Sequence, residues 1–119
     1  MVYTEGTWMM KSDTIQIHYA TAERKEMRDV VVVARYGTLV VHRSQGTTPG
    51  KGEAKGWSIT HAVSGYRVHR TPIATQLFAK KLAKHLSQAL DWTQVPSSGK
   101  APDAFLRELL TIIKEWQVM

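Results

Sequence analysis

The stretch that decides the fold runs from residue 57 to residue 90, WSITHAVSGYRVHRTPIATQLFAKKLAKHLSQAL. In its first part apolar and polar residues alternate, as Trp57 and Ile59 show, and this period of two is typical of a strand with one buried face. From residue 71 onward apolar residues recur every three or four positions, at Phe78, Leu82 and Leu86, which is the period of an amphipathic helix. The chain therefore changes from strand to helix near residue 71.

The strand part of this stretch predicts a β-hairpin. Ser64-Gly65 has the composition of a two-residue turn, which would place Arg67 opposite Ala62 on the paired strand. Trp57 and Ile59 then face the core. The opposite face of the hairpin carries side chains that can bind phosphate oxygens, namely Ser58, Thr60, Arg67 and His69. His61 shares the core-facing side, where we expect it to be hydrogen-bonded.

Further strands are predicted upstream. Residues 15–19 alternate as a half-buried strand does, and residues 30–34 are apolar on both faces, as in a central strand covered on both sides. Gly37 is suited to the positive φ of a hairpin turn, after which residues 38–43 form the next strand. Residues 44–56 contain four glycines and a proline and predict a mobile loop.

Two helices are predicted downstream. Thr71-Pro72 pairs a capping hydroxyl with a proline at the first helical position, so the first helix is placed at residues 71–90. After a linker containing Pro96 and Gly99, the second helix spans residues 102–117 and has a wide apolar face. The fold class is therefore α+β, in a single domain over residues 1–119: an antiparallel β-meander of about five strands over residues 13–70, followed by two C-terminal α-helices packed on one face.

Composition excludes several classes of protein. The 119 residues include no cysteine, so a disulfide framework and a thiolate nucleophile are absent. No apolar run reaches the roughly 18 residues that a membrane span needs. The first residues lack the pattern of a signal peptide, and we expect a cytoplasmic protein without a membrane partner.

No motif specifies a catalytic chemistry or a cofactor. The segment from Gly46 to Gly52 has one spacer residue too few for a phosphate-binding P-loop, and Gly52 stands where a magnesium-binding hydroxyl is required. The five histidines show no helical i, i+4 pair and have no nearby carboxylate, so no metal site is predicted. We therefore expect a binding protein rather than an enzyme, and no cofactor.

The charge distribution supplies the leading functional hypothesis. The net charge is +6, and residues 54–90 contain six Lys and Arg but no Asp or Glu. Such a basic segment favours sequence-independent contacts with the phosphates of DNA or RNA. The predicted phosphate-binding residues are Lys51, Lys55, Arg67, His69, Arg70, Lys80, Lys81 and Lys84.

Two alternative functions remain. Ile73 and Leu77 share the Lys80 side of the predicted helix, and Trp116 ends the wide apolar face of the second, so these three residues are a candidate partner interface. The protein would then be an interaction module, either a homodimer or an accessory protein of a phage or mobile element that inhibits a host complex such as a defence system. The third hypothesis is a small metal-independent nuclease, with His69 moving a proton beside Arg67 and Lys84.

A resemblance of topology accompanies these hypotheses. A twisted meander followed by an amphipathic helix is similar to several small single-stranded-DNA-binding and mobile-element proteins. No family motif supports this resemblance residue by residue, and a shared topology does not transfer a function.

Overall fold

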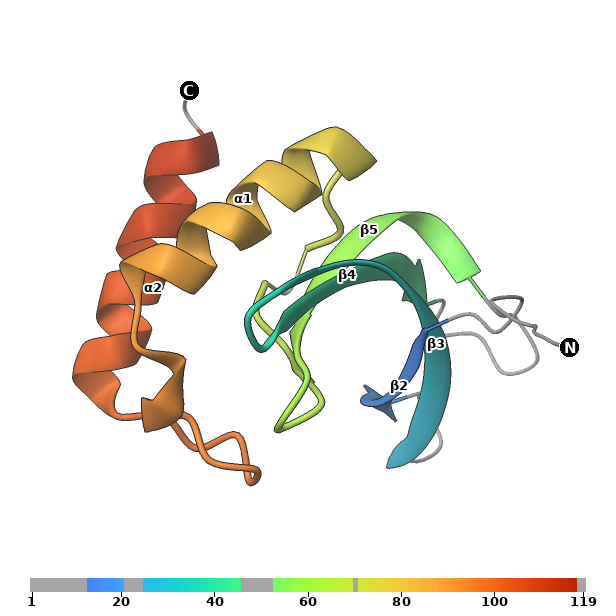
Figure 1. Cartoon of the computed structure of the whole chain (residues 1–119), viewed down its shortest axis with the longest axis horizontal. Coiled ribbons are helices and arrows are strands. Elements are labelled where there is room, and N and C mark those ends of the chain that lie inside the picture. The colour runs from blue at the N-terminus through green and yellow to red at the C-terminus, as the bar shows by residue number, and fades with distance from the viewer. Residues whose placement is uncertain (1–12, 21–24, 46–52, 70, 118–119) are drawn as a thin grey trace, which may run out of the picture.

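The chain forms one antiparallel sheet followed by two helices (Figure 1). The structure, a computed structural model, describes residues 13–20, 25–45, 53–69 and 71–117. Its strands are β2 (Thr14–Ala20), β3 (Lys25–Tyr36), β4 (Leu39–Gln45), β5 (Glu53–His61) and β6 (Tyr66–Arg67). Its helices are α1 (Gln76–Ala89), the short 3-10 helix η2 (Trp92–Gln94) and α2 (Asp103–Gln117). The predicted α+β class, with five strands before two C-terminal helices, is confirmed.

The sheet is a meander in which each strand pairs with the next, in the order β2-β3-β4-β5-β6. The turn between β3 and β4 lies between Tyr36 and Leu39, which pair with each other. Gly37 in this turn has a φ of 61°, a conformation that other residues adopt at a cost, and this confirms the predicted role of the glycine.

Both helices lie on the same side of the curled sheet (Figure 1). The buried face of α1 consists of Ala79, Leu82, Ala83 and Leu86, which belong to one core with Leu39, Val41 and Ile59 of the sheet. The periodic apolar residues Phe105, Leu109 and Ile113 of α2 complete this core. Helical periodicity in the sequence thus identified the buried residues of α1 and part of the predicted apolar face of α2, whereas Leu106 and Leu110 of that face are exposed.

The opposite face of the sheet is also buried and is partly polar. Ser58 and Thr60 are buried, so our prediction that they are available to phosphate is wrong. Their hydroxyls bond to neighbours on β4, since Ser58 Oγ lies 2.8 Å from Ser44 Oγ and Thr60 Oγ1 lies 2.7 Å from His42 Nε2. The curl of the sheet explains this burial, because it brings β2 to the β5–β6 turn, where the His18 N–H donates to the Gly65 carbonyl.

The β5–β6 hairpin differs from the prediction in its turn and register. Arg67 pairs with Thr60 rather than with Ala62, and four residues, 62–65, form the turn. The Gly65 N–H donates to the His61 carbonyl, and Ser64 Oγ accepts from the Tyr66 N–H and lies 3.0 Å from His61 Nδ1. These bonds pair backbone N–H groups of the wider turn, and the contact with Ser64 confirms that His61 is a hydrogen-bonded core residue.

Two predicted boundaries and one predicted burial pattern are corrected. The first helix begins at Gln76 rather than near Thr71, and Thr75 is its cap. Residues 30–34 are not covered on both sides, because Val31 is 51% exposed and Val33 is 39% exposed. The predicted loop at residues 44–56 is too long, since β4 extends to Gln45 and β5 starts at Glu53, while residues 46–52 lie outside the described ranges.

Candidate functional site

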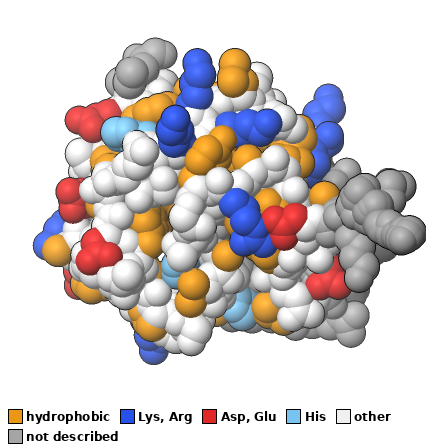
Figure 2. Space-filling view, in the orientation of Figure 1, with side chains coloured by type: hydrophobic (Ala, Val, Ile, Leu, Met, Phe, Trp, Pro, Cys, Tyr) orange, Lys and Arg blue, Asp and Glu red, His pale blue; other side chains and the backbone are white. Residues whose placement is uncertain are grey.

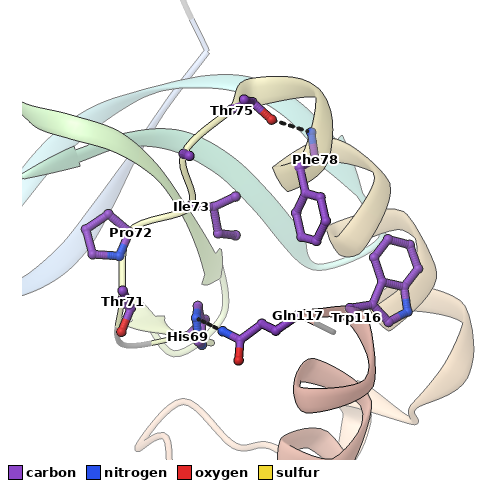
Figure 3. Close-up of a pocket in the computed structure, with 9 residues that line it drawn as sticks. His69, Thr71, Pro72, Ile73, Thr75, Phe78, Trp116 and Gln117 are labelled. Carbon is purple, nitrogen blue, oxygen red and sulfur yellow. Dashed lines mark hydrogen bonds between the residues drawn. The ribbon is translucent and has the colours of Figure 1, made fainter. Parts of the chain in front are cut away.

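A cavity of about 370 Å³ lies between the residues that precede α1, the first turns of α1 and the C-terminal end of α2 (Figure 3). Its walls combine aromatic, aliphatic and amide side chains with two threonines. The lining residues are His69, Thr71, Pro72, Ile73, Ala74, Thr75, Phe78, Trp116 and Gln117. The size is within the range of small-molecule sites in proteins.

The wall formed by Pro72 and Ile73 is held against β5 by the backbone. Trp57 and Ile73 exchange two hydrogen bonds of 2.8 Å, each N–H donating to the carbonyl of the other residue. Gly56 has a φ of 92°, and a Cβ added to it would lie 2.9 Å from Pro72 Cβ. Glycine at this position therefore permits both the positive φ within β5 and the close approach of Pro72.

The aromatic wall comes from both helices. Thr75 Oγ1 accepts a hydrogen bond of 3.2 Å from the Phe78 N–H and so begins α1 directly above the cavity (Figure 3). The Phe78 and Trp116 rings meet edge to face, with centroids 5.8 Å apart and planes at 84°. Trp116 also lies against His85, about two turns further along α1 than Phe78, with ring centroids 5.1 Å apart. These contacts fix the orientation of α2's end against α1.

On the polar side of the cavity, a hydrogen bond joins His69 and Gln117. The Nε2 atom of His69 lies 3.2 Å from the Nε2 atom of Gln117 (Figure 3). The amide nitrogen of Gln117 can only donate, so His69 Nε2 accepts and the proton of the imidazole is on Nδ1. Burial lowers the pKa of His69 below its ordinary value of 6.5, and the positive charge of Arg67 lowers it further. His69 is therefore neutral at pH 7.

The outer surface of α1 is basic. Lys81 and Lys84 are exposed and Lys80 is half-buried, and the helix contains no acidic residue. For these three lysines the described ranges hold no carboxylate within salt-bridge distance. Figure 2 shows Lys and Arg side chains gathered over α1 along the top of this face, whereas Asp and Glu side chains lie over α2 at the left edge. The lysines of α1 thus form a basic surface that contains no acidic residue of the helix itself.

The structure brings together some of the residues that the sequence singled out. His69, Ile73 and Trp116, which belonged to two different hypotheses, line one cavity. Ile73 is buried and precedes α1, whereas Leu77 is 64% exposed on α1.

The other predicted residues lie elsewhere. Lys55 is exposed on β5, two residues before Trp57, and so at the end of the sheet from which α1 starts. Arg67 is exposed on β6 and pairs with Thr60, which places it on the sheet face opposite α1. Lys51 and Arg70 lie outside the described residues.

Sequence reasoning missed Gln117 and assigned Phe78 only to the core. Gln117 lies 48 residues from His69, and no local pattern links the two positions. The role of Phe78 follows from its place at the edge of the buried stripe of α1, where one side of the ring contacts Trp116 and the ring also lines the cavity. Only the packing of α2 against α1 reveals this second role.

Neither a metal site nor a membrane helix is found in the described part of the chain. There, no three His, Asp or Glu side chains come together to hold a metal ion, and no helix has the length and apolar character to cross a bilayer. No protein-family model, curated protein or solved structure matches the chain. Its functional interpretation rests on the cavity and on the basic surface of α1.

Proposed function

We propose that this protein binds nucleic acid without catalysing a reaction, through phosphate contacts made by the basic surface of α1. The observation that carries the proposal is the acid-free helix, on which Lys80, Lys81 and Lys84 have no carboxylate partner among the described residues. Lysines in this state attract phosphates strongly because no internal ion pair has to be broken. Lys55, exposed on β5 two residues before Trp57, adds positive charge at the end of the sheet from which α1 starts.

The position of the lysines around α1 supports this assignment. An α-helix advances about 100° per residue, so Lys81 and Lys84 lie about 60° apart on the exposed side of the helix. Lys80 lies next to Lys84 on the far side from Trp116. A phosphate backbone that crosses the helix therefore meets several ammonium groups in succession.

Salt-dependent binding tests the proposal. We expect labelled single-stranded DNA, duplex DNA or RNA to bind at 50 mM salt and to bind much more weakly at 200 mM, because counterion release makes affinity fall steeply with salt. The double variant K81E/K84E should lose about tenfold or more in affinity at 50 mM salt, with a salt slope reduced by about one to two.

A matched variant controls for net charge. K100E/R107E makes the same change in charge at two exposed positions, in the loop before α2 and on α2. It should lose much less affinity than K81E/K84E. Absence of binding at 50 mM salt, or equal losses in the two variants, would overturn the proposal.

The same salt series separates a second candidate function, a protein-interaction module. Leu77 is 64% exposed one turn before Lys80 and Lys81 on α1, and Leu106 and Leu110 are exposed one turn apart on α2. Apolar contacts of this kind persist at high salt, whereas phosphate contacts weaken. A complex that survives high salt and involves no nucleic acid would favour the protein partner.

A further inference from the structure

The cavity beside α1 has walls suited to a planar ring. Phe78 and Trp116 form one side and Pro72 and Ile73 another, so a flat ligand inside it would contact apolar and aromatic surface on its faces (Figure 3). Aromatic and proline-lined walls stabilise a planar ligand by stacking and by excluding water from it. A volume of about 370 Å³ leaves room for one heterocyclic ring system.

The polar side of the cavity offers both a donor and an acceptor. Because Gln117 Nε2 donates to His69 Nε2, the Nδ1–H of His69 and the Oε1 of Gln117 stay available, and neither has a partner among the described residues. The edges of nucleobases carry donors and acceptors side by side, in contrast to aliphatic ligands or the aromatic side chains of a protein partner. Hydrogen bonding therefore favours a nucleobase.

The basic surface of α1 begins next to this cavity. Lys81 lies one turn beyond Phe78 and about 60° away around the helix axis, and His85 contacts Trp116. The first turn of α1, which borders the cavity, contains no acidic residue that would repel a phosphate. A nucleotide with its base in the cavity thus has lysines within reach of its flanking phosphates.

We propose that the cavity takes up one unpaired base of a single-stranded nucleic acid, while the adjoining phosphates lie on Lys81 and Lys84. This inference rests on the proposed function and narrows it to single strands. In a duplex the faces of each base are covered by its stacked neighbours and its pairing edge is occupied. A duplex can therefore contact the lysines but cannot place a base between Phe78, Trp116 and Pro72.

The test compares three probes of equal length on the full chain: oligothymidylate, the same strand with abasic sites at every position, and a duplex. At 50 mM salt we expect oligothymidylate to bind about tenfold more tightly than the abasic strand, since stacking of a base on aromatic side chains is worth about that factor. Equal binding of oligothymidylate and the abasic strand would overturn the inference while leaving the proposed function in place. Failure of all three probes to bind would refute both.

Variants at the polar side of the cavity locate the base. Q117A and H69Q remove hydrogen-bonding groups but keep the aromatic walls, so each should lower the preference for oligothymidylate over the abasic strand by about threefold to fivefold, while the salt-dependent binding of the abasic strand is retained. Q94A, at an exposed glutamine of η2, is the matched control and should keep the full preference. A preference that is undiminished in both Q117A and H69Q would place the base elsewhere and overturn the inference, as would duplex binding as tight as that of oligothymidylate.

Discussion

His42 shows how a polar residue is accommodated inside this sheet. It is 1% exposed, and its Nδ1 lies 2.7 Å from the Arg43 carbonyl, which can only accept, so Nδ1 carries the proton and donates. The hydroxyl of Thr60 is then free to donate to Nε2. Burial lowers the pKa of His42, the Arg43 carbonyl opposes this effect, and the charge of Arg67 adds to it. The native structure therefore holds this imidazole neutral.

The histidines whose pKa is lowered by burial should make the protein less stable in mild acid. Burial also lowers the pKa of His61 and His69, so three histidines protonate more readily in the unfolded chain than in the folded one. Their contribution to the free energy of unfolding is complete above the pKa of about 6.5 that histidine has in the unfolded chain. It is lost as the pH falls towards the lower pKa values of the folded state. Urea unfolding at pH 7.5, 6.5 and 5.5 should therefore give a steadily smaller free energy of unfolding.

Two variants identify the source of this pH dependence. H42Q removes one of the three groups and should make the change in stability between pH 7.5 and 5.5 smaller than in the parent. Q88A replaces an exposed glutamine of α1, which does not titrate, and should leave that change as it is. Stability that is constant or increases on acidification from pH 7.5 to 5.5 would contradict this account.

At the level of single residues, the sequence predicted what depends on local alternation. The parity of His61 with Trp57 and Ile59 was enough to predict a hydrogen-bonded histidine in the core, as the bond to Ser64 confirms. The pairing of His69 with Gln117 depends instead on how α2 docks, and no local period encodes that geometry.

Among the secondary-structure elements, α1 shows how a tertiary contact overrides a local signal. Thr71-Pro72 and Thr75-Gln76 both offer a capping hydroxyl, and the proline makes the first the stronger sequence signal. The two hydrogen bonds between Trp57 and Ile73 hold residue 73 in an extended conformation beside β5, so the helix can begin only after it. Sequence patterns do not contain this long-range bridge.

The two threonines give a direct test of where α1 begins. T75A removes the hydroxyl that accepts from the Phe78 N–H and should lower the free energy of unfolding by about 1 kcal/mol. T75S keeps a capping hydroxyl and should stay close to the parent. T71A should have a much smaller effect, measured by urea unfolding at pH 7.5. A loss in T71A as large as that in T75A would contradict the cap at Thr75.

The strand β3 shows a second limit of periodicity. Its run of valines is apolar on both faces, yet the helices pack on β4, β5 and the end of β3, so Val31 and Val33 are exposed. An apolar pattern indicates that a face can be buried. Which part of a curled sheet the helices reach depends on the connections between elements, here the short path from β6 through Ile73 to α1.

For the whole molecule, Tyr66 connects three separate parts of the chain. Its ring stacks on His18 of β2 at 3.9 Å with an interplanar angle of 17°. The ring also lies so close to Gly99, in the loop before α2, that a Cβ at residue 99 would overlap it. Together with the hydrogen bond from the His18 N–H to Gly65, this contact closes the curl of the sheet and attaches the helical layer to it.

Removal of this ring should open the sheet at one place. We expect Y66A to lower the free energy of unfolding by about 2 kcal/mol, because it removes an aromatic pair and leaves a gap beside Gly99. Hydrogen exchange should accelerate at the His18 amide, which donates across the closure, more than at the amides of α1, whose bonds lie within the helix. Y66F retains the ring and should match the parent in both measurements. If Y66A accelerated exchange equally at all amides, Tyr66 would act only through global stability, and β2 would be held by its pairing with β3 alone. Faster exchange confined to β2 and the β5–β6 turn would instead identify the Tyr66 contact as the closure of the sheet.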